Sequence, residues 1–242
     1  MKRNVVLTII LFLSVIGVRA QLNCTFTHYT QENGLSQNTI MDMIQDSDGL
    51  IWFATWKGIN RFDGYEFNND SQWSSNRVEK LEMDSHGNVW CVSYDGRAFR
   101  FDKRQEAFHE IKPQGNIDFI ADRIVALKNS SVWLLSPENG AVRVTGNSVT
   151  FENYGKVNNV FLDSRQHEWV LTDDGLRCID AKTNKQSTYF ATNKKTKAVD
   201  KQNFLSAVEA NGKIYFGSDK GRIWVNDIKT GGFTMKVLGI VA

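Results

Sequence analysis

The fold is decided by residues 46–64, which read DSDGLIWFATWKGINRFDG. Residues 84–102 repeat the same pattern as DSHGNVWCVSYDGRAFRFD. Each copy places a tryptophan, Trp52 or Trp90, after an Asp-x-x-Gly turn and a glycine six residues further on. Two copies of one pattern indicate an internal repeat, and a repeat of fixed period identifies the architecture before any single residue does.

Three weaker copies follow the first two. Their apolar runs are centred on Trp133, Trp169 and Tyr215, so the five anchor aromatics stand about forty residues apart. Within each repeat, β-branched and aromatic residues form short runs between turns, as the strands of an antiparallel sheet do. Four strands in a repeat of about forty residues predict an all-β protein, a β-propeller of about five four-stranded blades. We place the blades at about residues 39–70, 77–109, 121–152, 157–190 and 203–233.

The pattern assigns roles to two of its positions. An anchor aromatic such as Trp52 is expected between neighbouring blades, where it buries a large apolar area. The turn aspartate, such as Asp46, is expected to bond the backbone of its own turn. The several spaced carboxylates of a calcium loop are missing from these turns, so the sequence predicts no metal there.

Residues 1–20 have the composition of a secretory signal peptide. A basic start precedes an apolar run at residues 5–18, which is too short to span a bilayer, and small residues precede a cleavage point before Gln21. Residues 21–242 then carry nearly balanced charge, which argues against nucleic-acid partners and anionic membrane surfaces. We therefore expect an exported, periplasmic chain that is not inserted in a membrane after cleavage.

The histidines and cysteines form no recognisable catalytic pattern. The histidines are His28, His86, His109 and His167. His86 and His167 precede an anchor aromatic in a turn, so we do not expect the set to converge on one metal. Cys91 and Cys178 are interpreted as small strand residues, since no Cys-x-x-Cys pair occurs. The sequence predicts no catalytic residue, no metal and no cofactor.

Residues 33–40, which read NGLSQNTI, and the repeat at residues 46–64 closely resemble the opening blade of two-component regulator propellers. Such propellers form the periplasmic sensor region of hybrid two-component systems in Bacteroides-type, glycan-degrading bacteria. The resemblance implies a sensory role within a receptor that is a homodimer anchored in the inner membrane. It also implies that this chain is an N-terminal fragment of a seven-bladed propeller, because the kinase and DNA-binding parts of such receptors have no counterpart in its sequence.

Two aromatic residues suggest where a ligand binds. Trp56 and Tyr94 occupy equivalent positions after the second strand of adjacent blades, so both are expected on one face of the propeller. Exposed rings on a rigid scaffold suit stacking against the sugar rings of an oligosaccharide. Asp95, Asp173 and Lys57 are expected to bond sugar hydroxyls nearby. The competing interpretation is that Trp56 packs on its own blade.

Two questions stay open at the level of sequence. Five blades form either a closed ring, with residues 25–29 lending a strand to the last blade, or an open arc. The role is either that of a glycan-responsive sensor propeller or that of a stand-alone exported interaction scaffold, with a propeller lyase as a third alternative. The basic run at residues 193–197 is interpreted as a solvated loop.

Overall fold

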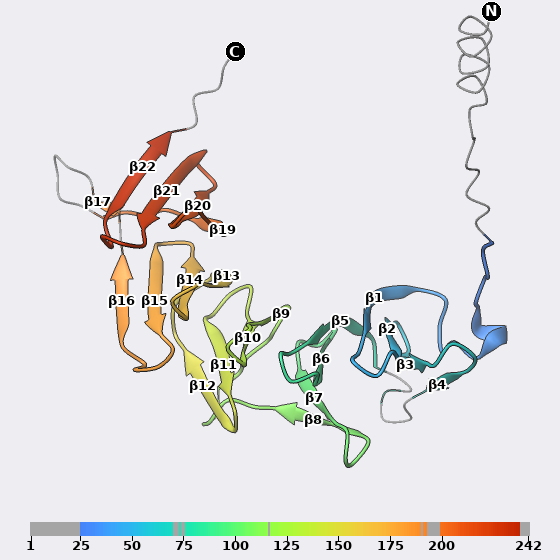
Figure 1. The fold of residues 1–242 in the computed structure, drawn as a ribbon. Helices are drawn as coiled ribbons and strands as arrows, with labels where there is room; N and C mark the ends of the chain where they lie inside the picture. The colour runs from blue at the N-terminus through green and yellow to red at the C-terminus, as the bar shows by residue number, and fades with distance from the viewer. Residues whose placement is uncertain are drawn as a thin grey trace, which may run out of the picture.

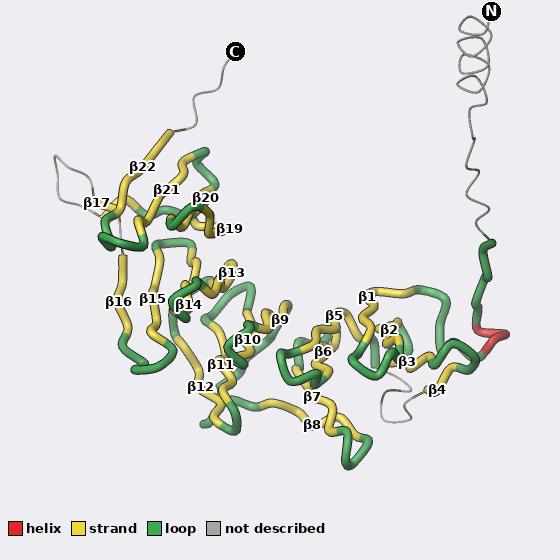
Figure 2. The backbone as a smooth tube through the Cα atoms, in the orientation of Figure 1, coloured by secondary structure: helices red, strands yellow, loops and turns green. Residues whose placement is uncertain are grey.

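The structure is a computed structural model that describes residues 25–69, 73, 76–115, 117–189, 191–192 and 199–237. Within these residues the chain is almost entirely β-structure, with one short 3-10 turn, η1 (Gln31–Asn33) (Figure 2). The predicted signal peptide and the basic run at residues 193–197 lie outside the described residues. None of the helices among the described residues is long and apolar enough to cross a membrane.

The described residues form five four-stranded antiparallel sheets. The first sheet consists of β1 (Ile40–Gln45), β2 (Ile51–Thr55), β3 (Gly58–Phe62) and β4 (Phe67–Asn69). The second consists of β5 (Val78–Met83), β6 (Val89–Ser93), β7 (Ala98–Asp102) and β8 (Ala107–Ile111). The third consists of β9 (Arg123–Ala126), β10 (Ser131–Leu135), β11 (Ala141–Thr145) and β12 (Ser148–Glu152).

The fourth sheet consists of β13 (Val157–Leu162), β14 (His167–Thr172), β15 (Leu176–Asp180) and β16 (Gln186–Tyr189). The fifth consists of β19 (Phe204–Ala210), β20 (Lys213–Ser218), β21 (Arg222–Asp227) and β22 (Phe233–Val237), after a two-stranded ribbon of β17 (Ala191–Thr192) and β18 (Val199–Asp200). In every sheet the strands pair in chain order, as in a propeller blade. The prediction of about five four-stranded propeller blades is therefore confirmed.

The sheets stand side by side along an open arc, with the first and fifth sheets at its two ends (Figure 1). Residues 25–29, which could have closed a five-bladed ring, form no strand. Tyr29 instead packs on Phe62 and Phe67 of the first sheet, with ring centroids 5.0 and 5.6 Å apart. The closed-ring alternative is thus not the arrangement of this structure.

The hydrophobic core is divided among the spaces between neighbouring sheets. Each space holds the anchor tryptophan of the preceding sheet, and the four such residues, Trp52, Trp90, Trp133 and Trp169, are each exposed by 1% or less. Burial of rings of this size, together with the apolar strand residues around them, stabilises each contact between sheets. The predicted place of the anchor aromatics is confirmed for these four.

The turn between the first two strands of a sheet is held by its aspartate. Asp46 Oδ1 accepts the N–H groups of Asp48 and Leu50 at 2.9 and 3.0 Å, as expected from the turn pattern. Its Oδ2 accepts the indole N–H of Trp52 at 2.8 Å, a bond that the sequence did not predict. The same bond joins Asp84 to Trp90 and Asp163 to Trp169. One carboxylate therefore satisfies both the turn and the buried indole.

The third sheet has Leu127 at the position of that aspartate, six residues before Trp133. The indole N–H of Trp133 is instead accepted by Glu168 Oε2, on the fourth sheet, at 3.1 Å. Glu168 also forms a 2.8 Å ion pair with Arg143, and both side chains are buried. The carboxylate that the third sheet lacks is thus supplied by its neighbour.

Candidate functional site

The predicted ligand residues Trp56 and Tyr94 lie in tight turns whose glycines allow close packing. Gly58 and Gly96 follow them with φ angles of 95° and 79°, a backbone conformation that suits glycine. A Cβ atom at Gly58 would lie 2.6 Å from the carbonyl oxygen of Trp73. Trp73, between the first and second sheets, therefore packs directly against this turn.

Arg77, just before β5, brings the two predicted aromatics together. Its guanidinium carbon lies 4.8 Å from the ring centroid of Trp56 and 4.7 Å from that of Tyr94. Its backbone carbonyl accepts the N–H of Tyr94 at 2.9 Å, and its side chain pairs with Glu79 at 2.5 Å. The rings of two adjacent sheets are thus joined through one cation, an arrangement that stabilises their positions by cation–π attraction.

We name the surface formed by Trp56, Arg77 and Tyr94 the aromatic platform. Trp56 is 48% exposed and Tyr94 is 70% exposed. The indole N–H of Trp56 lies 3.1 Å from the sulfur of Met41, in its own sheet. Trp56 is therefore anchored on its own blade, as the competing interpretation expects, and still presents about half of its surface to solvent.

Of the two predicted aspartates, one lies beside the platform and the other lies apart from it. Asp95 follows Tyr94 and accepts bonds from Ser93 and from Arg97, the latter at 2.7 Å. Burial acts to raise the pKa of Asp95, but these bonds outweigh it and lower the pKa, so the carboxylate stays ionised. Asp173 is exposed on the corresponding turn of the fourth sheet, and the third sheet stands between it and Tyr94. The structure does not bring Asp173 to the platform.

Lys57 is exposed next to Trp56, where it was expected. Arg77 is the residue that sequence reasoning missed, because it stands at the very start of the predicted second blade and has no part in the repeated turn pattern. The only available signal was its place as the first residue of that predicted blade. A cation between two exposed aromatics cannot be recognised until both turns are placed in space.

The histidines lie at separate places in the fold: His28 precedes the first sheet, and His109 lies on β8 of the second. His86 lies in the turn of the second sheet, 3.4 Å from the hydroxyl of Ser130, and His167 begins β14 in the fourth sheet. Within the described ranges, no group of three or more His, Cys, Asp or Glu side chains is placed to hold a metal ion. Cys91 and Cys178 are buried on strands β6 and β15, as predicted.

Comparison with known proteins relates the first sheet to a protein family. A family model described as two component regulator propeller matches residues 34–57, which include β1, β2 and Trp56. A protein named histidine kinase P4, from Formosa agariphila, is 41% identical over 68 residues, which cover 27% of this chain and 5% of that protein. The resemblance to two-component regulator propellers is confirmed for this part of the chain.

Two solved structures of similar fold belong to very different proteins. One is the extracellular domain of what is described as a hybrid two-component system from B. thetaiotaomicron, with 20% identity and a TM-score of 0.56 over 85% of this chain and 30% of that one. The other is virginiamycin B lyase from Staphylococcus aureus, with 14% identity and a TM-score of 0.54 over 82% and 70% of the two chains. At such identities the likeness shows the propeller fold alone. The chain spans less than a third of the length of the first of these structures.

Proposed function

We propose that this chain, which carries a two-component regulator propeller repeat, is the ligand-recognition part of an exported sensor and binds oligosaccharides at the aromatic platform. The observation that carries the proposal is the pair of exposed rings, Trp56 and Tyr94, which Arg77 holds together across two neighbouring sheets. Their placement on rigid turns suits a recognition surface, because little conformational entropy is lost when a ligand stacks on them.

The chemistry of the platform favours carbohydrate over other small ligands. The faces of sugar rings carry C–H groups that pack on aromatic rings, while their hydroxyls need hydrogen-bond partners. Lys57 and Asp95 stand next to the two rings in sequence and supply a donor and an acceptor. Asp173 is left out of this set, because it lies on the fourth sheet.

The sensor role rests on the family repeat at residues 34–57. In a complete receptor, we expect this propeller to face the periplasm and the receptor to be a homodimer anchored in the inner membrane. A bound glycan would then act by favouring one arrangement of the dimer over another. Enzymatic turnover is not part of this proposal.

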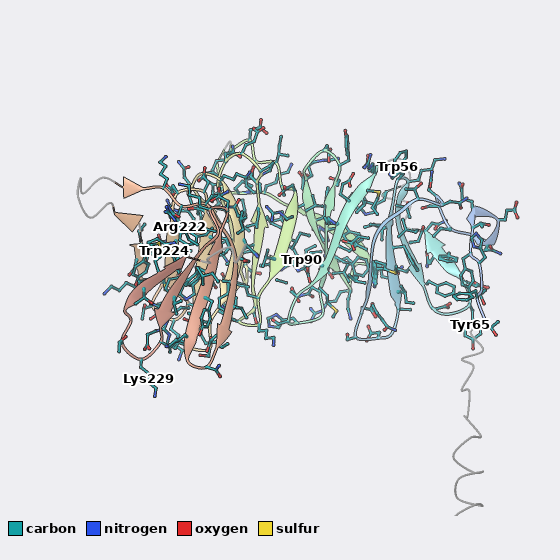
Figure 3. The ribbon with its side chains drawn as sticks, turned by 90° about the horizontal axis from the view of Figure 1, so that it is seen from above. Trp56, Tyr65, Trp90, Arg222, Trp224 and Lys229 are labelled. Atoms are coloured by element: carbon teal, nitrogen blue, oxygen red, sulfur yellow. The ribbon has the colours of Figure 1, made fainter. Side chains whose placement is uncertain are left out.

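The test is calorimetric titration of the purified protein with a panel of oligosaccharides. We expect W56A and Y94A each to weaken binding of the recognised glycan at least tenfold, because each removes one stacking surface. Y65A is the matched control, since Tyr65 is 90% exposed but lies in the turn between β3 and β4, at the opposite end of the strands from Trp56 (Figure 3).

Equal binding by W56A, Y94A and the unaltered protein would refute the platform as the glycan site. The stand-alone scaffold alternative predicts that no oligosaccharide of the panel raises the melting temperature. A lyase would instead show turnover of its substrate.

A further inference from the structure

The segment that joins the second sheet to the third lies against the β6–β7 turn of the aromatic platform. A Cβ atom at Gly96, the glycine of this turn, would lie only 3.0 Å from the Cβ atom of Ile120. The N–H of Ala121 donates to the carbonyl of Gly96 at 2.8 Å. The N–H of Asp122 donates to the carbonyl of Leu135, in the third sheet, at 2.9 Å. Backbone bonds to two sheets therefore hold Ile120 in place.

Trp73 occupies the corresponding position one sheet earlier. It packs on Gly58, the equivalent glycine of the first sheet, and is 1% exposed in the core between the first two sheets. Ile120 lies on the same kind of support but is 52% exposed. The position thus contributes to the core in one connection and presents an apolar side chain to solvent in the next.

Ile120 belongs to a row of exposed apolar side chains. The row begins with Trp56 and Tyr94 and continues to Ile120, which packs on the glycine two residues after Tyr94. A cavity of about 370 Å³ opens beside that glycine, and its wall includes Ile117, which is 36% exposed. The volume lies in the range of about 300–1,000 Å³ that is typical of ligand pockets. Adjoining exposed apolar groups mark interaction sites, whereas scattered ones do not.

The charges of this extended surface balance. Three of its cations form ion pairs with nearby carboxylates, at N–O distances of 2.5 to 3.1 Å. The pairs are Arg77–Glu79, Arg97–Asp95 and Lys112–Glu110. Lys57, next to Trp56, and Asp118, in the cavity wall, carry opposite charges. A surface with balanced charge favours a neutral ligand over an ionised one.

We infer that the aromatic platform is one part of a longer site, which binds a linear, neutral, ribbon-like glycan of at least three sugar residues. The inference rests on the proposed function. Trp56 and Tyr94 contact the Arg77 guanidinium from different sheets, so each ring stacks on a different sugar residue. A third residue of the chain then lies over Ile120, whose methyl groups pack on the C–H groups of the sugar face.

The experiment is calorimetric titration of the purified protein with cello-oligosaccharides and β-manno-oligosaccharides, each as a series from mono- to hexasaccharide. In the series that binds, we expect the trisaccharide to bind at least tenfold more tightly than the disaccharide, because only the trisaccharide reaches Ile120. The acidic counterpart of that trisaccharide has a carboxylate in place of each hydroxymethyl group. It should bind at least tenfold more weakly, because the surface offers no excess of positive charge.

A variant at Ile120 separates the third contact from the platform. I120S should fold, since the side chain is half exposed, and its melting temperature without ligand checks this. It should weaken trisaccharide binding about tenfold and leave disaccharide binding unchanged, whereas W56A should weaken both. I120V keeps an apolar contact and should bind like the unaltered protein.

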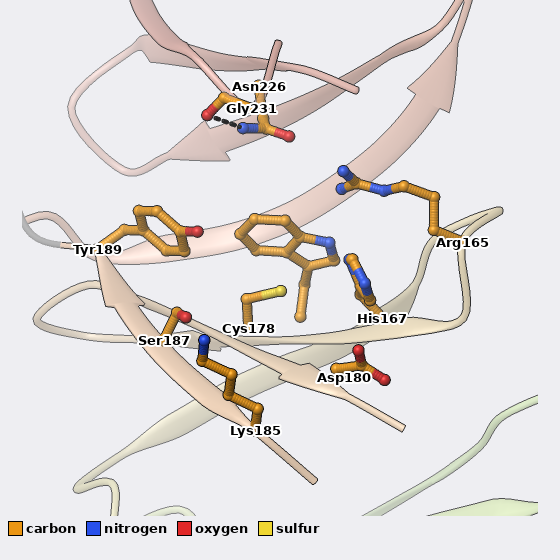
Figure 4. Close-up of a pocket in the computed structure, with 10 residues that line it drawn as sticks. Arg165, His167, Cys178, Asp180, Lys185, Ser187, Tyr189, Asn226 and Gly231 are labelled. Atoms are coloured by element: carbon orange, nitrogen blue, oxygen red, sulfur yellow. Dashed lines mark hydrogen bonds between the residues drawn. The ribbon is translucent and has the colours of Figure 1, made fainter. Parts of the chain in front are cut away.

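K185A is a control in a different part of the array, because Lys185 lines a cavity between the fourth and fifth sheets (Figure 4). It should bind every member of both series like the unaltered protein. Loss of trisaccharide binding in K185A would place the ligand in that cavity and overturn the inference.

The remaining outcomes distinguish this inference from the proposed function. Equal affinity for disaccharide and trisaccharide, with weaker binding by W56A, would overturn the third contact and leave the proposed function standing. The inference is also overturned if folded I120S binds the trisaccharide like the unaltered protein, if the acidic counterpart binds as tightly, or if neither series binds. The proposed function is refuted only when W56A and Y94A bind the recognised glycan like the unaltered protein.

Discussion

Asp84 illustrates how one carboxylate holds both a turn and a contact between sheets. It accepts the N–H groups of His86 and Asn88 at 2.9 and 3.0 Å and the indole N–H of Trp90 at 2.9 Å. Burial acts to raise the pKa of Asp84, but the bonds from Asn88, Trp90 and the turn backbone outweigh burial and lower the pKa. The ionised carboxylate is therefore part of the folded state.

This residue gives a prediction about acid stability. Because the folded pKa lies below the unfolded value of about 3.9, the contribution of Asp84 is complete above about pH 4 and is lost as the pH falls through the folded pKa. D84N should reduce stability at pH 7 by about 1.5–3 kcal/mol, since one acceptor oxygen becomes neutral and the other is replaced by an NH2 group that cannot accept the N–H groups facing it. It should also flatten the fall in stability between pH 7 and pH 3.

Urea denaturation at a series of pH values measures both effects. D48N is the matched control, because Asp48 lies in the corresponding turn of the first sheet and pairs with Lys103 at the surface, which contributes at most about 1 kcal/mol. A D84N protein with the same pH dependence as the unaltered chain would contradict the assigned role.

At the scale of the element, the contact between the third and fourth sheets differs from the others. Glu168 stands where the other repeats have apolar residues such as Ile51 and Val89. Its carboxylate accepts the indole N–H of Trp133, because the third sheet has Leu127 in place of the turn aspartate. In the sequence, the third repeat has Leu127 and not an aspartate six residues before its anchor tryptophan. The sequence could not show the compensation, because the acceptor belongs to another repeat and the period says nothing about contacts between sheets.

The role of Glu168 can be tested by returning the carboxylate to position 127 of the third sheet. E168V leaves Arg143 without its buried partner, so it should reduce stability by about 3–5 kcal/mol. The double variant L127D/E168V restores the arrangement of the first, second and fourth sheets, in which the turn aspartate accepts the indole N–H. We expect it to recover part of the melting temperature that E168V loses.

L127D alone is the control for this pair, because it buries a second carboxylate near Glu168 and should destabilise the chain. Additive effects of the two substitutions on melting temperature would show that they do not compensate. That result would contradict the claim that Glu168 takes the place of a turn aspartate at position 127.

At the scale of the whole molecule, the open arc gives its two end sheets unlike environments. The free face of the first sheet is covered in part by Tyr29, which packs on Phe62 and Phe67. On the fifth sheet, Val208 is 57% exposed opposite Tyr215, on the face turned away from the fourth sheet. The repeat count was predictable from the sequence, whereas the choice between ring and arc was not, because closure depends on how successive sheets pack.

These environments predict a gradient of local stability along the arc. Each sheet contacts its neighbours along the array, so a sheet with neighbours on both sides should open less often than one at an end. Hydrogen exchange measured by mass spectrometry should be slowest in the second, third and fourth sheets, faster in the first and fastest in the fifth. Y29A should increase exchange in the first sheet and leave the fifth unchanged. Uniform exchange across all five sheets would contradict this model of nearest-neighbour stability.

The shared carboxylate of Glu168 also bears on the ancestry of the array. Repeat proteins gain and lose units by duplication and recombination, and a self-contained unit survives such events alone. A gene that lost the fourth repeat would leave the indole of Trp133 without its acceptor and Arg143 as a buried orphan charge. We therefore expect the third and fourth repeats to be inherited together, so that homologues with rearranged blades keep these two adjacent or have an aspartate at position 127.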